Sequence, residues 1–190
     1  MIFDSIQLYA GKADGIGAKA VPTELNSNEI RLLCENVTDV EKLEISVYER
    51  VVLMTRANCI KATKGNCDRN RANLTTLKDR VGNVFPVYTN CNHCYNKIYN
   101  YLPTSLYDSM WMLREDGIKR YRLDFAMEDE METTEVLKTY AGLLSSENWK
   151  QKSSYKGAFT RGHIKRGAQK FLGGNRFHLQ LDSRLAQGAD

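Results

Sequence analysis

Two short segments of the chain alternate apolar and polar residues, and this alternation is the clearest structural pattern in the sequence. In residues 42–48 one face carries Leu43, Ile45 and Val47, and the other carries Glu44, Ser46 and Tyr48. In residues 118–125 one face carries Tyr121, Leu123 and Phe125, and the other carries Arg120, Arg122 and Asp124. Successive side chains of a strand point to opposite faces of a sheet. Both segments are therefore predicted to be strands that bury one face.

Three other segments have the apolar spacing of a helix. The residues expected to face the core are Ile30, Leu33 and Cys34, then Leu106, Met110 and Leu113, then Val136, Leu137, Tyr140, Leu143 and Leu144. The expected N-terminal caps are Asn26 or Ser27, then Ser105, then Thr133 or Thr134. Strands and helices therefore alternate along much of the chain. That order is typical of parallel strands joined by crossover helices.

A stretch of turn-forming residues interrupts this alternation. Residues 78–83 combine Lys, Asp, Gly and Asn, and a short apolar run follows them. Turn residues beside an apolar run are typical of a β-hairpin. A further strand is expected at 97–101. The hairpin would fold the two later cysteines of this region back toward the two earlier ones.

Together these patterns predict an α/β fold, a partial (β/α) barrel with a cysteine-rich loop and a hairpin inserted into it. The expected regions are an unassigned N-terminal remnant at 1–22, the partial barrel with a four-cysteine site at 23–167, and a basic tail at 168–190.

Charged residues on the polar faces of the two strands are the candidate catalytic residues. In a closed barrel the outer faces of the strands pack against helices, and the chemistry takes place at the carboxyl-terminal mouth. Glu44, Arg122 and Asp124 would then point into the lumen. The alternative is an edge strand whose charged face is solvated. The sequence contains no Gly-rich phosphate loop and no Ser/His/Asp arrangement.

The composition of the 190 residues is that of an ordinary globular protein, with 42% hydrophobic and 26% charged residues. No apolar run approaches the roughly 18 residues of a membrane span, and no basic segment followed by an apolar one opens the chain. We therefore expect neither a membrane span nor a signal peptide. Five cysteines without a secretion signal favour a reducing, cytoplasmic setting, in which disulfides are the poorer explanation of the cysteines.

Four of the five cysteines form two pairs. Seven residues separate Cys59 from Cys67, and two separate Cys91 from Cys94. A two-residue gap lets both sulfurs reach one ion or one cluster, so we expect four thiolates on a metal centre. Spacing does not decide between a four-iron four-sulfur cluster and zinc, although the wide first pair mildly favours the cluster. The alternatives are cysteines with no joint role, a redox pair of the last two, or His93 replacing one ligand.

The charge of the chain is unevenly distributed. From Lys150 to Arg176 there are eight Lys or Arg residues and no Asp or Glu. The same segment carries Tyr155, Phe159 and Phe171. Basic side chains interleaved with aromatic rings can follow a phosphate backbone and stack on bases. A solvated basic tail explains the composition equally well.

Five motifs occur in a fixed order along the chain. They are 53–59 with Cys67, 77–87, the Cys91/Cys94 pair, 122–125 and 159–167. In this order they resemble the collagenase-like peptidase family, number thirty-two among the peptidases of unknown catalytic type. The resemblance covers about Glu24 to Gly167, and no single motif would be specific.

The resemblance implies a (β/α)-barrel domain and, as in several members, an iron–sulfur site with four cysteines, matched here by Cys59, Cys67, Cys91 and Cys94. It also implies two competing activities. One is a peptidase that includes collagen degradation, and the other is oxygen-independent hydroxylation of RNA bases or of a quinone precursor. Family members have a longer catalytic region, so this chain looks like its C-terminal portion. A second chain is therefore a possible partner that completes the barrel.

The residues favour hydroxylation over peptide hydrolysis. A peptidase needs a nucleophile with a base or a metal-bound water, and the sequence offers no His-Glu-x-x-His motif and no obvious Ser or Cys paired with a base. We expect iron–sulfur-dependent hydroxylation of an RNA base, with a peptidase or a non-catalytic metal-stabilised fragment as alternatives. Arg122 would hold an anionic co-substrate, Asp124 would orient it or relay protons, and Glu44 is a weaker third candidate. The residues expected to contact RNA phosphates are Arg161, His163, Lys165 and Arg166.

Overall fold

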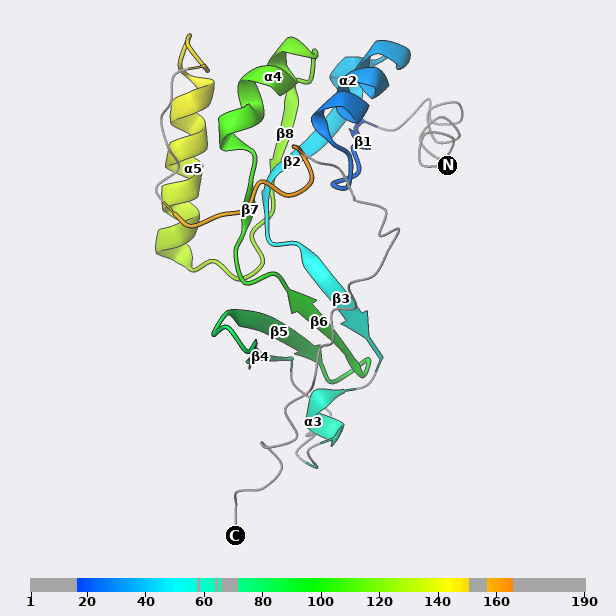
Figure 1. Cartoon of the computed structure of the whole chain (residues 1–190), viewed down its shortest axis with the longest axis vertical. Coiled ribbons are helices and arrows are strands. Elements are labelled where there is room, and N and C mark those ends of the chain that lie inside the picture. Colours follow the sequence, from blue (N-terminus) through cyan, green and yellow to red (C-terminus); the bar gives the residue numbers. More distant parts are fainter. Residues whose placement is uncertain (1–16, 58, 64, 66–71, 151–156, 166–190) are drawn as a thin grey trace.

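The chain forms two sheets that lie at opposite ends of the described structure (Figure 1). The computed structural model describes residues 17–57, 59–63, 65, 72–150 and 157–165. Sheet A consists of β1 (Lys19–Ala20), β2 (Leu43–Glu49), β7 (Thr104–Ser105) and β8 (Arg120–Leu123). Sheet B consists of β3 (Val52–Arg56), β4 (Asn73–Lys78), β5 (Val84–Asn90) and β6 (Tyr95–Tyr99). The α/β class expected from the sequence is confirmed.

Sheet A has the parallel pairing that the alternation of strands and helices predicts. Strands β1 and β8 pair with β2 in parallel, whereas β7 pairs antiparallel with the last two residues of β2. The helices of this part are α2 (Ser27–Asn36), α4 (Met110–Glu115) and α5 (Glu130–Leu144). Helix α2 connects β1 to β2, α4 precedes β8, and α5 follows it.

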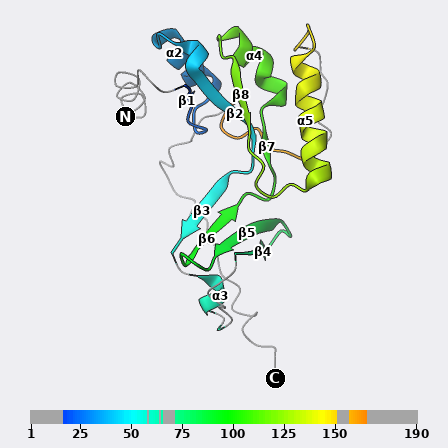
Figure 2. The ribbon, with the colours of Figure 1, turned by 180° about the vertical axis from the view of Figure 1, so that it is seen from behind.

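The three helices pack on one face of sheet A and form the core with it, and Figure 2 shows the same grouping from behind. On β2 the buried apolar residues are Leu43, Ile45 and Val47. The helices contribute Ile30, Leu33, Met110, Leu113, Val136, Tyr140 and Leu143, each with at most 4% of its surface exposed. Apolar residues at helical spacing therefore meet the apolar face of the predicted strand.

Sheet B is antiparallel throughout, in the order β3-β6-β5-β4. Strands β4 and β5, and β5 and β6, are joined by short connections, and short connections between paired strands require antiparallel pairing. The hairpin predicted around 78–83 is confirmed as β4 and β5. Asp79 fixes its turn by accepting hydrogen bonds from the backbone N–H groups of Val81 at 2.9 Å and Asn83 at 2.8 Å. Helix α3 (Ile60–Thr63) follows β3.

Helix starts were predicted with mixed success. Asn26 caps α2 in a capping box with Glu29, as expected. The prediction of Thr133 or Thr134 for α5 is wrong, because Asp129 caps that helix with Glu132 as its partner. The prediction of Ser105 is wrong as well. Ser105 lies in β7, and its buried side chain forms a hydrogen bond of 2.8 Å with the hydroxyl of Tyr140 on α5.

The described residues form no closed barrel: the strands of sheet A that run parallel there are β1, β2 and β8. The first of these strands, β1, and the buried Val21 that follows it come from the region 1–22, to which the sequence analysis assigned no role. The tail at 168–190 lies outside the described residues. No helix in the described part of the chain is long and apolar enough to cross a membrane.

Candidate active site and cysteine site

The face of sheet A opposite the helices carries a group of interacting polar side chains. We call it the polar-face cluster, and its members are Glu44, Ser46, Glu49, Arg122 and Asp124. It contains all three residues that the sequence proposed as catalytic. Arg122 and Asp124 are each 43% exposed and Glu44 is 29% exposed, so the cluster can be reached from solvent.

Arg122 joins the two strands across this face. Its Nε donates to Oδ2 of Asp124 at 2.8 Å, and its Nη1 donates to Oε1 of Glu44 at 3.2 Å. The hydrogen bond to Asp124 raises the pKa of the guanidinium further above its ordinary value. With a carboxylate on each side, much of the positive charge of Arg122 is already neutralised. The geometry therefore favours Arg122 as the group that holds Asp124 in place more than as a free anion site.

Glu49 joins the cluster through an irregularity in β2 that the sequence pattern did not reveal. The pairing of β2 with β8 shifts register between Ser46 and Tyr48. Strict alternation would place Tyr48 on the polar face, but its side chain is 2% exposed and packs against the rings of Phe125 and Tyr140. A β-bulge turns the following side chains by one position. Glu49 is thereby brought near Asp124 instead of facing the helices.

The environment of Glu49 disfavours its charged form. Burial raises the pKa of Glu49, and the negative charges of Asp124 and Glu24 add to the rise. The positive charge of Arg122 and the nearby Ser46 hydroxyl act in the opposite direction without cancelling it. Two carboxyl groups beside each other cannot both ionise without a cost in energy.

The carboxylates of this face also follow a positional rule. Glu24 follows β1, Glu49 ends β2, and Asp124 follows β8 directly. The carboxyl ends of consecutive parallel strands are where β/α enzymes hold their catalytic residues. The sequence analysis missed Glu24 and Glu49, although their positions at strand ends were a usable signal.

The described cysteines of the metal prediction lie at one end of sheet B. Cys59 follows β3, and Cys91 and Cys94 form the turn between β5 and β6. In the register of the sheet, Arg56 pairs with Asn96, and Asn90 pairs with Tyr95. The end of β3 and the β5–β6 turn therefore share one edge, which we call the cysteine end. Cys67, in the segment that connects α3 to β4, lies outside the described residues.

The three thiols at the cysteine end differ in accessibility. Cys59 and Cys91 are buried at 5% and 2% exposure, whereas Cys94 is exposed and has a left-handed backbone with φ of 53°. His93 is exposed beside them. Thiols of this kind are suitable donors for iron or zinc. Among the described residues, however, no three His, Cys, Asp or Glu side chains are grouped closely enough to hold a metal.

Cys34 is the fifth cysteine and belongs to the core, as the sequence predicted. It is buried on α2 in the cluster under sheet A. Burial, followed by the charges of Asp116 and Glu35, raises the pKa of its thiol to about 11. A thiol that stays protonated is a poor ligand and a poor nucleophile.

The polar-face cluster and the cysteine end are far apart along the molecule. Strand β3 leaves the end of β2 and runs away from sheet A, and its five residues span about 16 Å. Figure 1 accordingly shows α3 at the far end of sheet B. The described cysteines therefore lie far from the charged residues that the sequence proposed as catalytic.

The predicted RNA contacts are partly occupied by other interactions. Arg161 donates to Oδ2 of Asp108 at 2.7 Å and lies over the ring of Phe159. His163 and Lys165 are exposed, and Arg166 lies outside the described residues. Arg161, His163 and Lys165 are therefore accessible, but Arg161 is paired with Asp108.

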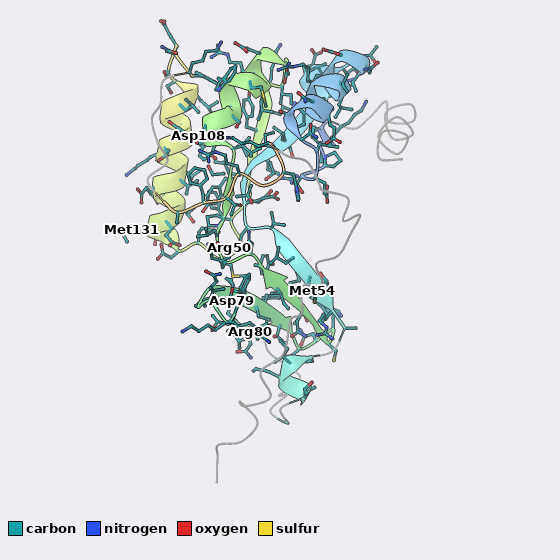
Figure 3. The ribbon with its side chains drawn as sticks, in the orientation of Figure 1. Arg50, Met54, Asp79, Arg80, Asp108 and Met131 are labelled. Atoms are coloured by element: carbon teal, nitrogen blue, oxygen red, sulfur yellow. The ribbon has the colours of Figure 1, made fainter. Side chains whose placement is uncertain are left out.

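A cleft of about 310 Å³ opens where the two sheets meet, and it includes none of the predicted site residues. Its lining residues are Tyr48, Arg50, Tyr101, Glu128, Glu132 and Glu135, among others. Figure 3 shows Arg50 at this junction. Arg50 and Glu128 form an ion pair with each other at 3.3 Å, so the most buried charged groups of the cleft stabilise the fold. We therefore place the candidate active site on the open face of sheet A.

No family model, curated protein or solved structure matches this chain. The resemblance to the collagenase-like peptidase family is consequently carried by the sequence motifs alone and stays a prediction.

Proposed function

We propose that the chain is part of an iron–sulfur enzyme that hydroxylates an RNA base without oxygen, and that its polar-face cluster performs the acid–base steps. One observation carries the acid–base role. Two carboxyl groups, Glu49 and Asp124, occupy the ends of neighbouring parallel strands on a face that solvent reaches. A pair of carboxyl groups in which the environment favours the neutral form of one member is suited to general acid–base catalysis.

The chain's own residues have distinct roles in this proposal. Asp124 orients the substrate or relays its proton, while Arg122 holds the carboxylate in a fixed position through the 2.8 Å hydrogen bond. Glu44 fixes the other side of the guanidinium at 3.2 Å. These contacts support a positioning role for Arg122 in place of direct binding of an anionic co-substrate.

The proposed cofactor is a four-iron four-sulfur cluster, with zinc as the alternative. Cys59, Cys67, Cys91 and Cys94 would hold it, and it would supply one-electron transfer. Support comes from the shared location of the three described thiols at one end of sheet B. The accessible His163 and Lys165, with Arg161 and Arg166, would contact RNA phosphates. A second polypeptide would add the strands needed to close the barrel.

The cofactor proposal is tested by anaerobic purification followed by iron, sulfide and zinc analysis. About four irons and four sulfides per chain are expected. Cys91→Ser should lose them, and Cys34→Ser, which changes a core thiol, should keep them. One zinc per chain without sulfide would support the zinc alternative instead of the cluster. The absence of iron, zinc and sulfide together would contradict the proposal.

The reaction is tested by incubating RNA anaerobically with the reduced protein and searching its nucleosides for hydroxylated bases by mass spectrometry. Asp124→Asn should abolish the product while leaving the metal content unchanged. Casein or gelatin turnover that survives loss of the cluster would instead support the peptidase.

A specific observation favours a second candidate, a non-catalytic protein in which the metal only stabilises sheet B. The cysteine end lies at the opposite end of sheet B from sheet A (Figure 1). For that candidate, Cys91→Ser would unfold sheet B, and no RNA product would form with either the original or the altered protein.

A further inference from the structure

Sheet B is covered on one face and open on the other. The covered face carries Val87, Thr89 and Asn96, which are exposed at 0%, 1% and 1%. Directly paired residues of neighbouring strands share a face, and successive residues of a strand alternate between faces. We call the opposite face the tyrosine face, and its members are Thr55, Leu74, Thr76, Lys78, Val84, Pro86, Tyr88, Asn90, Tyr95, Lys97 and Tyr99. Each of them is at least partly exposed to solvent.

Three tyrosines of this face surround Lys97. Tyr88 on β5 is its direct partner across the strands. On β6 itself, Tyr95 precedes Lys97 by two positions and Tyr99 follows it by two, so each lies about 7 Å away along the strand. The amine of Lys97 lies 6.0 Å from the centroid of the Tyr95 ring. Strands β5 and β6 are the central strands of the sheet (Figure 1), so pairing on both sides holds these residues in place.

The strands of sheet B carry basic residues and no acidic ones. Arg56, Lys78 and Lys97 are the basic residues, and the four strands contain no Asp or Glu. Lys78 and Lys97 belong to the tyrosine face. A solvated face that only stabilises its sheet gains from opposite charges paired across neighbouring strands. The strands of sheet B contain no such pair, so the positive charge of this face can attract a partner of the opposite sign.

Aromatic rings beside lysines match the chemistry of a single-stranded nucleic acid. Unpaired bases stack on aromatic side chains, and lysines neutralise the phosphates between them. Four-stranded sheets whose exposed aromatic side chains stack two or three bases are a common means of binding unpaired RNA. A duplex keeps its bases stacked inside, so it cannot use the rings. An uncharged protein partner would use the rings but leave the lysines without a counter-charge.

We propose that the tyrosine face binds an unpaired segment of nucleic acid. The rings of Tyr88, Tyr95 and Tyr99 stack on successive bases, and Lys78 and Lys97 contact the phosphates. That the bound segment is the RNA modified by the polar-face cluster rests on the proposed function, whereas the binding itself does not.

The stacking is tested by the fluorescence anisotropy of a short labelled oligouridylate, titrated with the full chain. The original protein should bind this single strand more tightly than an RNA duplex of the same length. Tyr88→Ala and Tyr99→Ala should each weaken single-strand binding by about 5- to 100-fold, because each removes one stacking ring. Tyr88→Phe, which keeps the ring, should bind nearly as tightly as the original protein.

The phosphate contacts are tested by repeating the titration at several salt concentrations. Lys97→Gln should reduce the slope of log K against log salt by about 0.7, the value for one phosphate contact on a single strand. The matched control is Lys138→Gln, which removes an exposed lysine from α5 and should leave the slope unchanged.

Any of three results would overturn the proposal. The first is that the original protein fails to bind the oligouridylate or binds the duplex equally well. The second is that both alanine variants bind as tightly as the original protein. The third needs no variant to fold: ultraviolet crosslinks from the oligouridylate to the original protein, mapped by mass spectrometry, would lie outside 84–90 and 95–99. Because these measurements need no cluster and no reaction, the tyrosine face can bind RNA while the hydroxylation assay fails, and the reverse.

Discussion

At the residue scale, the structure separates charge pairs that hold the fold from those that remain accessible. The side chains of Arg50 and Glu128 are only 14% and 2% exposed. Arg50 also donates to the carbonyl oxygens of Asn100 and Tyr101 at 3.3 and 2.9 Å. Arg50 therefore ties the chain leaving sheet B to the segment before α5. The ion pairs that Arg122 forms with Glu44 and Asp124 are, by contrast, accessible to solvent.

Glu128→Gln should lower the free energy of unfolding by about 3 kcal/mol, because it leaves Arg50 buried without its counter-charge. Burial opposes the charge of Glu128, but backbone N–H groups and Arg50 outweigh it and hold the pKa below the ordinary 4.5. The stabilisation is therefore present above pH 4.5 and is lost as the pH falls through the lower, folded-state pKa. Urea denaturation at several pH values measures the effect.

The control for this substitution is Lys42→Gln, which breaks the exposed pair of Lys42 with Asp39. Because both side chains are exposed, this substitution should leave the free energy of unfolding almost unchanged. Equal losses in the two variants would contradict the structural role assigned to Arg50 and Glu128.

Unlike Glu128→Gln, Glu49→Gln should raise the free energy of unfolding at neutral pH. Burial and neighbouring carboxylates raise the pKa of Glu49 in the folded protein, so its charged form is less favourable there than in the unfolded chain. The neutral amide removes this penalty at neutral pH. The gain should fade as the pH falls through the raised folded-state pKa toward the ordinary value of 4.5, and it should be absent below 4.5, where Glu49 is protonated in both states. Thermal unfolding of both proteins between acid and neutral pH measures the effect. A variant that is less stable than the original protein at neutral pH would contradict the prediction.

At the scale of elements, a single backbone conformation decides where β8 begins. Gly117 follows α4 with φ of 90°, and Ile118 after it is 1% exposed in the core. A Cβ at Gly117 would lie 3.1 Å from Cγ1 of Val40, which is closer than side-chain carbons normally pack. Gly117 therefore sets the direction in which the chain enters the strand that carries Arg122.

Gly117→Ala should lower the free energy of unfolding by about 1–3 kcal/mol, because an L side chain is strained at this φ. Gly142→Ala is the matched control. Gly142 lies in α5, where an added Cβ would meet no atom within 4 Å, and alanine there should add about 0.5–1 kcal/mol. Chemical denaturation measures both, and a stabilising Gly117→Ala would contradict the turn geometry.

At the scale of the whole molecule, the two sheets depend on different kinds of stabilisation. Sheet A has three helices and a continuous apolar core behind it. Sheet B exposes Leu53, Leu74 and Val84 at 53%, 63% and 48% and has the cysteine end at its far edge. A sheet with little apolar burial benefits most from a bound metal.

Removal of the proposed metal by a chelator should therefore loosen sheet B and leave sheet A intact. Amide hydrogen exchange should accelerate in 73–78, 84–90 and 95–99 and stay slow in 43–49. Mass spectrometry of peptides from treated and untreated protein measures this difference. If the chelator changed the exchange rates of both sheets to the same extent, the cysteine end would not be what stabilises sheet B.

Residues with a local signal were predicted from the sequence alone. Alternation located β2 and β8, helical spacing located the core residues Ile30, Leu33 and Met110, and turn residues located the β4–β5 hairpin. Cys34 was assigned correctly to the core. These features depend on neighbours within a few positions along the chain, so the pattern of side chains is sufficient to reveal them.

Tertiary structure alone decided which of these elements meet. The bulge that buries Tyr48 and brings Glu49 toward Asp124 depends on the pairing of β2 with a strand more than seventy positions later in the chain. The antiparallel order of sheet B likewise separates the cysteine end from the polar-face cluster. The sequence by itself determined the strands, the helices and the chemical types of the candidate residues. Their distances were decided by contacts between remote segments, because a local pattern carries no information on which distant strand will be its partner.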